Sequence, residues 1–564
     1  MTTKLELSES ELRHGRLRQV KVVALLATIA LAVVAAAAGV VAVSRGALKA
    51  QGSALAVVTM PRGGGQITRL AAIAGRERQV IALRARGSEV FPVKPLPPGE
   101  SVTIQATVKR PGWIAWLSGT YEHLRLTVST PRVRVRSAFL TRRRGRPLTV
   151  SFTGAVARAG YRNDGSARLV AGVLGAPQDN LVLNESAQAG SAKVAFAARS
   201  WELASKTTVS WFPAGRTASV ITTPAPGTAI KPDTPITLMF SKPVSNVLGG
   251  SDPKLSPQTT GSWRQLNSRT LEFVPTGYGY GLAATVTVGL PSGVQLVGRS
   301  GAPVGGVAQW SVPGGSTAAL EQMLAGLGYL PVRFHPSSTG SAASSPTASA
   351  AAAGTSAGDV TSVQALEAAA VAPPAGTYSW RYPHTPDALK ALWSPTQFTE
   401  LTKGAVMAFE NTQGLAVDGV PGPEVWKALI NAVVKHETYN FGYTFVMVSE
   451  KLPETIHVWH NGRIVVAGLA NTGIPASPTA TGTYAVYLHI PVGTMSGLNP
   501  DGTPYHDTGI PWISYFNGGD ALHGFIRASY GFPQSLGCVE MPFSEAGLVY
   551  PYTPIGTIVH ITAA

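Results

Sequence analysis

Residues 521–542 read ALHGFIRASYGFPQSLGCVEMP, and this stretch decides the architecture expected around it. His523 stands fifteen residues before Cys538, and Gly537 directly precedes the thiol. A free thiol has a pKa of about 8.5, so a neighbouring imidazole is needed to take its proton at neutral pH. The backbone around Gly524 could orient that imidazole, and Gly537 would let amide groups turn toward an oxyanion. The residues of this stretch would suit a cysteine nucleophile with a histidine base.

Cys538 is the one cysteine among 564 residues, so the chain has no internal disulfide and depends on packing for its stability. A lone cysteine is a candidate reactive thiol. The alternative is a small buried Cys538 and a structural His523, which the spacing alone does not exclude.

The sequence on both sides of this stretch predicts a β-rich domain over 437–564. Its strand patterns are YTFVMVSE, TIHVWHNGRIVVAGLA, TGTYAVYLHI and GTIVHITA. Trp512 and Tyr515 precede His523 on an expected strand, where they could line a substrate groove or pack in the core.

Helical patterns precede this domain, over 316–432. Leu320, Met323, Leu324 and Leu327 recur at helical spacing, and residues 402–429 predict two helices around a turn at Asp418-Gly419. The pattern resembles the three-helix peptidoglycan-binding domain, with a helical packing adaptor that binds no glycan as the alternative. Residues 336–358 are nearly all Ser, Ala, Thr, Gly and Pro, which predicts a disordered insertion.

Short strand-like runs separated by Pro, Gly, Asn and Ser extend from residue 52 to 312 and predict β-sandwiches. Residues 213–315 resemble the bacterial immunoglobulin-like spacer domains, with Phe240, Trp263, Leu271 and Phe273 as the expected core. Residues 52–212 predict a further β-domain. The expected fold is therefore multidomain and mainly β, and these two parts are expected to be spacers.

The N-terminal region predicts a membrane anchor. Residues 22–43 are uncharged and apolar, and as a helix they would span about 33 Å. Basic residues are denser before this run than after it, which predicts a cytoplasmic tail over 1–21 and an extracytoplasmic catalytic domain. A cleaved signal peptide is the alternative, but the run exceeds the usual length of its apolar region.

Charge is unevenly distributed along the chain. Residues 51–150 hold 17 Lys and Arg against 4 Asp and Glu, net +13, whereas residues 437–564 hold 3 against 8, net −5. The basic part would attract anionic wall polymers or lipid headgroups. It contains no recognisable nucleic-acid module, and Arg132, Arg134 and Arg136 alternate with valines as one solvated strand face does.

Four motifs in the C-terminal domain resemble, in order, those of the YkuD-type L,D-transpeptidase family. They are NTG at 471–473, SPTATGTYAV at 477–486, GIPWISYFNGGDALHG at 509–524 and SLGC at 535–538. The resemblance implies that Cys538 is the nucleophile, His523 the general base and Gly524 the residue whose carbonyl orients it. Ser535 and Gly537 match the family's Ser-His-Gly-Cys segment.

Two positions depart from the family pattern. Leu536 replaces the histidine between that serine and glycine, and Glu540 replaces the Asn or Arg two residues after the cysteine. The first would leave the proton transfers to His523. The second would change how a substrate carboxylate or amide is held, so Glu540 and Ser535 join Tyr515 and Trp512 as candidate substrate-binding residues.

The resemblance implies a thioester acyl-enzyme that cross-links peptidoglycan stem peptides, with no metal or organic cofactor and with carbapenem-type β-lactams as covalent inhibitors. An L,D-carboxypeptidase would use the same acyl-enzyme, with water as the acceptor. A non-catalytic tether between membrane and wall is the alternative from another class. Leu536 and Glu540 favour it, whereas the intact Cys538, His523 and Gly537 argue against it.

Overall fold

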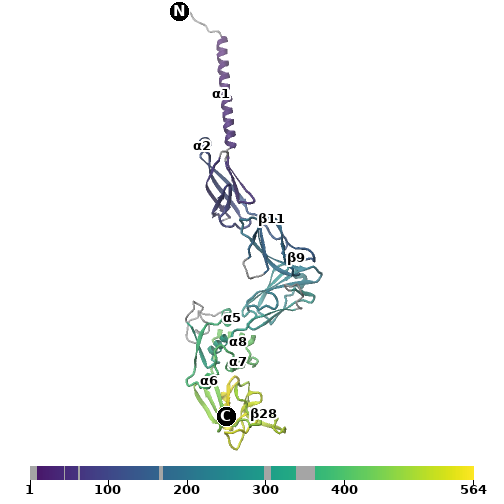
Figure 1. The fold of residues 1–564 in the computed structure, drawn as a ribbon, viewed down its shortest axis with the longest axis vertical. Coiled ribbons are helices and arrows are strands. Elements are labelled where there is room, and N and C mark those ends of the chain that lie inside the picture. Colours follow the sequence, from purple (N-terminus) through teal and green to yellow (C-terminus); the bar gives the residue numbers. More distant parts are fainter. Residues whose placement is uncertain are drawn as a thin grey trace, which may run out of the picture. The chain divides into compact units, whose positions relative to one another are not determined.

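The computed structural model describes residues 9–43, 45–60, 64–75, 77–163, 169–297, 307–337 and 363–564. The chain divides into two units, the first running to Arg216 and the second beginning at Thr217. As predicted, the fold is mainly β, with an N-terminal apolar helix and a small helical region (Figure 1).

Helix α1 (Glu9–Val43) carries the predicted membrane segment. Its apolar stretch, Val20–Ala42, has 23 residues with a mean hydropathy of 2.6, and none of it is buried within the protein. At 1.5 Å per residue this stretch is about 35 Å long, which is enough to cross a hydrocarbon core of about 30 Å. Of the predicted 1–21 tail, residues 9–21 belong to the same helix, and residues 1–8 lie outside the described residues.

The first unit continues with two four-stranded sheets around one hydrophobic core that includes Leu55, Val90 and Ile104. A short helix, α2 (Gly112–Ser118), interrupts the connection between β7 and β8. One sheet has the order β1 (Ala47–Lys49), β2 (Ala56–Thr59), β6 (Glu89–Pro92), β5 (Leu83–Arg86); the other has the order β4 (Gln79–Ile81), β3 (Gln66–Ala74), β7 (Ser101–Lys109), β8 (Tyr121–Ser129).

A separate core in the same unit contains Phe152, Val194 and Trp211. The 52–212 region therefore holds two cores where the sequence suggested one β-domain. The exposed Arg132, Arg134 and Arg136 alternate with half-buried valines that pack on this second core, as the strand period predicts. Its sheet has the order β11 (Gly172–Leu183), β10 (Leu148–Arg162), β12 (Gly190–Ala197), β13 (Ser205–Pro213), β9 (Phe139–Arg142).

The second unit opens with a two-sheet sandwich in the region predicted to be immunoglobulin-like. Phe240, Leu271 and Phe273 are buried in its core, and Trp263 packs against them. The larger sheet has the order β17 (Gly261–Asn267), β18 (Thr270–Pro275), β15 (Ile236–Phe240), β14 (Ala218–Thr223), β20 (Val294–Leu296); the smaller has β16 (Leu255–Ser256), β19 (Thr285–Gly289), β21 (Val307–Ser311), and α3 (Val244–Leu248) follows β15.

The helical region packs the predicted apolar faces into one core around Leu324, Phe409 and Trp426. Ser316 caps the first helix by accepting a hydrogen bond from the Ala319 amide. The predicted insertion begins on the last residue of β22, and residues 338–362 lie outside the described residues. The elements are α4 (Thr317–Leu327), β22 (Val332–Pro336), α5 (Val363–Val371), β23 (Gly376–Trp380), α6 (Asp387–Ala391), α7 (Glu400–Gln413) and α8 (Pro423–Val434).

The C-terminal region contains two sheets that share a core with α9 (Phe543–Val549), followed by the short η1 (Tyr550–Tyr552). The first sheet has the order β26 (Arg463–Leu469), β25 (Thr455–His460), β24 (Thr444–Ser449), β32 (Ile558–Thr562), β27 (Gly482–Ala485). The second has the order β28 (Leu488–Leu498), β29 (Pro504–Asn517), β30 (Asp520–Gly524), β31 (Val539–Met541), and its last two strands carry the stretch that opened this account.

Candidate active site

Strand pairing brings the two ends of the 521–542 stretch together. Strands β30 and β31 run parallel, with Leu522 opposite Val539 and His523 opposite Glu540. Cys538 directly precedes β31 and packs against the small cluster that contains Ala521. Because alternate residues of a strand share a face, Ala521 and His523 lie on the same side of the sheet as this cluster. The fold therefore places the imidazole on β30 and the thiol at the start of the neighbouring strand β31.

The imidazole of His523 is buried and oriented. Its side chain is 2% exposed, and Nδ1 lies 3.1 Å from the Gly524 carbonyl oxygen. A carbonyl can only accept, so Nδ1 carries the hydrogen and Nε2 is left as the basic nitrogen. Burial lowers the pKa of His523, and the Glu540 carboxylate opposes this shift. The histidine is therefore neutral and able to accept a proton at neutral pH.

The Cys538 thiol is half-buried, and Sγ lies 3.7 Å from the Gly519 carbonyl oxygen. Burial raises the pKa of the thiol to about 12, and the charges of Asp520 and Glu540 act in the same direction. A hydrogen bond from the Ala521 amide opposes them. The thiol and the imidazole are thus both neutral in the resting state, so the thiol proton must leave as the sulfur attacks.

The turn before Cys538 is held by Ser535. The Ser535 hydroxyl donates to the Cys538 carbonyl at 2.6 Å and accepts from the Gly537 amide at 3.2 Å. Gly537 has φ 117°, and a Cβ there would lie 2.4 Å from Oδ1 of Asp520, so both backbone and space require glycine. Ser535 therefore shapes the turn. The Gly537 amide, predicted as an oxyanion donor, is already engaged.

Glu540 lies beside His523 and is paired with Arg527. The guanidinium donates to both carboxylate oxygens at 2.8 Å and stacks over the ring of Phe525. The Glu540 side chain is 5% exposed and that of Arg527 is 31% exposed. The negative charge that Glu540 introduces at this position is therefore neutralised by Arg527. Of the two side chains, Arg527 is the one partly exposed to solvent.

The two aromatic candidates lie on different faces of β29. Tyr515 packs with Cys538 around Ala521, and the thiol contributes to the raised pKa of this tyrosine after burial. Trp512 packs on the C-terminal core and meets Phe543 of α9 edge-on, with ring centroids 5.9 Å apart. Tyr515 is thus at the site, whereas Trp512 serves the core.

Three residues near the thiol escaped the sequence prediction. Asp520 stands beside Gly537, Arg527 holds Glu540, and Tyr505 lies close enough for the thiol to raise its pKa after burial. Asp520 follows two glycines, and this pattern predicts a turn but does not predict that the carboxylate lies near the thiol. The sequence motif identifies the cysteine and the histidine. It does not identify which charged side chains the fold turns toward the sulfur.

The NTG motif supports the loop that leads to the nucleophile. Asn471 Oδ1 accepts from the Gly531 amide at 2.9 Å. The amide and hydroxyl of Thr472 each donate to the buried carboxylate of Glu454 at 2.6 Å. The backbone of Asn471 also pairs with Glu540. The NTG motif therefore helps to fix the position of residues 531–540.

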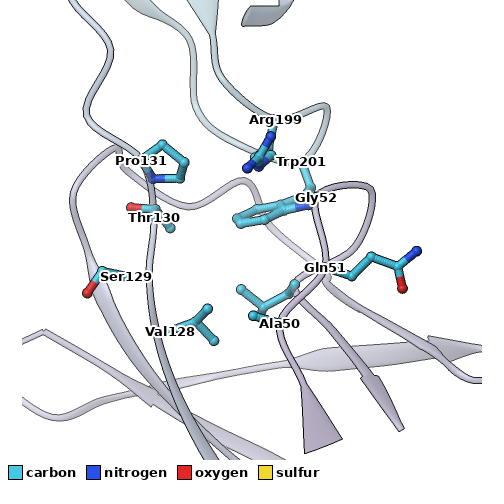
Figure 2. A pocket seen from close by; sticks show the side chains of 10 residues that line it. Ala50, Gln51, Gly52, Val128, Ser129, Thr130, Pro131, Arg199 and Trp201 are labelled. Carbon is cyan, nitrogen blue, oxygen red and sulfur yellow. The ribbon is translucent and has the colours of Figure 1, made fainter. Parts of the chain in front are cut away.

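A pocket of about 300 Å³ lies elsewhere, in the first unit (Figure 2). Arg199 and Trp201 line one side of it and the 128–131 segment lines the other. It lies beside the first core of that unit, which contains Leu55 and against which Val128 and Trp201 pack. Cys538 belongs to the second unit, so the catalytic candidates are not part of this pocket.

Comparison with protein families identifies two modules. Residues 444–561 match the YkuD family of L,D-transpeptidase catalytic domains, and residues 382–429 match a family of peptidoglycan binding domains. The second match covers α6, α7 and the first part of α8, so α4 lies outside it even though α4 shares their core. A comparison with curated proteins finds no match.

Solved structures similar to this chain include several L,D-transpeptidases. The catalytic domain of the E. faecium enzyme is 23% identical, covering 21% of this chain and 96% of its own, with a TM-score of 0.20. The Mycobacterium smegmatis enzyme is 12% identical, covering 61% and 99%, with a TM-score of 0.20. A Mycobacterium tuberculosis enzyme is 12% identical, covering 60% and 96%, with a TM-score of 0.19. At such scores these likenesses carry no argument about mechanism. The family matches are what show that the chain contains a YkuD-type L,D-transpeptidase catalytic domain beside a peptidoglycan-binding domain.

Proposed function

We propose that the protein is an L,D-transpeptidase that cross-links peptidoglycan stem peptides through a thioester on Cys538. The main support for this proposal is that, inside the matched catalytic domain, His523 lies on β30 and Cys538 directly precedes β31, the strand that pairs with it. The hydrogen bond from His523 to the Gly524 carbonyl supports the role of base, because it leaves Nε2 free to accept a proton.

In the acylation step the Cys538 sulfur attacks the carbonyl between the third and fourth residues of a tetrapeptide stem. The thiol proton moves to Nε2 of His523, and the carbonyl oxygen becomes an oxyanion. We expect the Cys538 backbone amide, which directly follows the turn at Gly537, to donate a hydrogen bond to this oxyanion. Collapse breaks the amide bond, His523 returns the proton to the departing amine, and D-alanine leaves a thioester behind.

In the second step the side-chain amine of another stem attacks the thioester. His523 accepts a proton from this amine, the carbon–sulfur bond breaks, and the thiolate recovers its proton. Water in place of the amine would give an L,D-carboxypeptidase. The raised pKa of the thiol makes concerted proton transfer more favourable than a preformed thiolate.

The remaining modules would hold the enzyme at its substrate. The apolar stretch of α1 would anchor the chain in the cell membrane as a single pass, with the N-terminus in the cytoplasm and the catalytic domain facing the wall. The peptidoglycan-binding domain would contact glycan. The β-domains between them would act as spacers.

Product analysis with a disaccharide-tetrapeptide tests this function. Chromatography and mass spectrometry should detect a cross-linked dimer and free D-alanine with the full chain, and neither with Cys538→Ala. Free tripeptide without dimer would replace the transpeptidase with a carboxypeptidase. Unchanged tetrapeptide, with a folded protein, would favour the non-catalytic tether.

A further inference from the structure

Helix α2 presents an apolar stripe to solvent. Trp113, Trp116 and Leu117 follow the i, i+3, i+4 spacing of one helix face, and they are 50%, 80% and 40% exposed. Ile114 faces inward and is 1% exposed. A soluble fold usually buries such residues, so two exposed indoles on one turn of helix need a partner.

The loop that carries α2 is fixed in place. The Arg110 amide donates to the Thr120 carbonyl at 2.9 Å and closes the loop. The Arg110 guanidinium donates to the carbonyls of Ser118 and Gly119 at the end of the helix. The indole N–H of Trp116 donates to the Trp113 carbonyl at 2.8 Å. The indole rings are therefore held outward by the fold, with the N–H of Trp116 already paired.

The same loop is tied to the exit of α1. The Gly46 amide donates to Oε2 of Glu122 at 3.0 Å, and Oε1 of Glu122 lies 3.4 Å from Nη2 of Arg110. Helix α2 also contacts α1, and Figure 1 shows it beside the end of α1 that leads into the β-strands. Gly46 is three residues past Val43, so it lies within about 11 Å of the end of the helix. The headgroup layer on each side of the hydrocarbon core is about 5–8 Å thick, so Gly46 lies at or close to its outer edge if α1 spans the membrane.

Polar and basic groups surround the apolar stripe. Tyr121, next to the loop, is 54% exposed, and its strand partner Lys109 is exposed as well. Arg45 and Lys49 are exposed on the segment that leaves α1. Indole and phenol rings favour the interface between hydrocarbon and water, and Lys and Arg favour anionic headgroups. The arrangement matches the boundary of a lipid bilayer.

We propose that α2 is a second membrane contact, in which Trp113, Trp116 and Leu117 insert into the outer leaflet beside the exit of α1. This inference rests on the proposed anchoring by α1. The contact adds a docking surface that would fix the orientation of the first β-domain against the bilayer. The anchor α1 alone would leave that orientation unfixed. The partner is a lipid surface with anionic headgroups.

Spin labels on the full chain in nanodiscs of phosphatidylcholine and phosphatidylglycerol test the proposal. In a Cys538→Ser background, single cysteines are placed by Leu117→Cys on α2, Leu31→Cys within α1, and Val173→Cys on β11. Val173 is a matched control because it is an apolar residue of the same unit, 75% exposed. Oxygen concentrates in lipid, whereas a nickel chelate stays in water. The rate at which each reagent collides with a spin label therefore reports whether the label is in lipid or in water.

The proposal expects the labels at 31 and 117 to be accessible to oxygen and the label at 173 to the nickel chelate. Adding Trp113→Ser and Trp116→Ser should shift the label at 117 toward water and leave the label at 31 in lipid. If the label at 117 is exposed to water while the label at 31 is in lipid, the α2 contact is overturned and the anchoring stands. The same holds if added peptidoglycan then shields the label at 117 from the nickel chelate. A water-exposed label at 31 overturns the anchoring on which the proposal rests.

Discussion

At the scale of single residues, burial is the main cause of the raised pKa of Cys538, and Asp520 adds to it. Its carboxylate lies beside Gly537, and its negative charge helps to raise the pKa of Cys538. Asp520→Asn removes that charge and should lower the pKa of the thiol. The pH dependence of iodoacetamide alkylation measures this directly, because the chain has a single cysteine. Asp501→Asn, an exposed turn carboxylate, is the control and should leave the profile unchanged. Identical profiles for all three proteins would show that Asp520 has no such effect.

The ion pair between Arg527 and Glu540 also makes a residue-scale prediction. Glu540→Gln leaves the guanidinium without its charge partner, and breaking a buried pair costs about 3 kcal/mol. The cost should be at the low end because Arg527 is partly exposed. Calorimetry of thermal unfolding measures it. The control is Glu272→Gln, which breaks the pair with the exposed Arg264 and should cost at most about 1 kcal/mol. Equal effects of the two substitutions would contradict this account.

At the scale of elements, the turn that joins residues 531–536 to β31 depends on Gly537. Gly537→Ala forces a side chain at φ 117° into the Asp520 carboxylate, so the turn must move and displace the sulfur. A displacement of about 1 Å lowers the acylation rate on the order of 100-fold. Gly502→Ala is a matched control, since Gly502 has φ 85° with nothing within 4 Å of a Cβ. Carbapenem acylation rates should fall for Gly537→Ala only. Equal rates for both variants would contradict the role of the turn.

The helical region should be more stable in mild acid. Burial raises the pKa of Glu321, Glu367 and Glu410 to about 7 each. A carboxyl whose folded pKa exceeds its unfolded value stabilises the fold fully below the unfolded pKa, near 4.5, and that contribution is lost as pH rises toward 7. Hydrogen exchange of α4 and α7, corrected for intrinsic rates, should therefore show weaker protection at pH 7.5 than at pH 5.

The glutamate that links α4 to α7 allows a sharper version of this test. Glu321 accepts hydrogen bonds from the Thr396 amide and the Thr402 hydroxyl. Glu321→Gln should reduce the pH-dependent part of the protection by about a third, since it removes one of three such carboxyls. The exposed Glu424→Gln on α8 is the control. A pH dependence that survives Glu321→Gln intact would contradict the assignment.

Sequence patterns predicted individual elements better than their grouping. The strand-like runs expected between residues 52 and 312 include those that form β7 and β15, because alternating burial is a local property of a strand. The division of 52–212 into two cores was not predicted, because a strand pattern does not show which strands pair. The Arg527–Glu540 pair was missed for a related reason: the two side chains meet only when β30 and β31 come together.

At the scale of the whole molecule, chemistry and attachment are assigned to different parts of the chain. The family matches lie within residues 382–561, whereas the apolar helix and the basic 51–150 region precede them. The sequence predicted this order because each part has its own composition. It gave no sign of the α2 contact, because two tryptophans in a short loop are equally consistent with a buried core.

The central claim is that Cys538 forms the acyl-enzyme with His523 as its base, and intact-protein mass spectrometry tests it most directly. The full chain in detergent is incubated with a disaccharide-tetrapeptide and separately with a carbapenem, in parallel with Cys538→Ala and His523→Ala. We expect a covalent adduct on the unaltered chain with both reagents, none with Cys538→Ala, and a strongly slowed adduct with His523→Ala. An adduct retained by Cys538→Ala, or none on the unaltered folded chain, would contradict it.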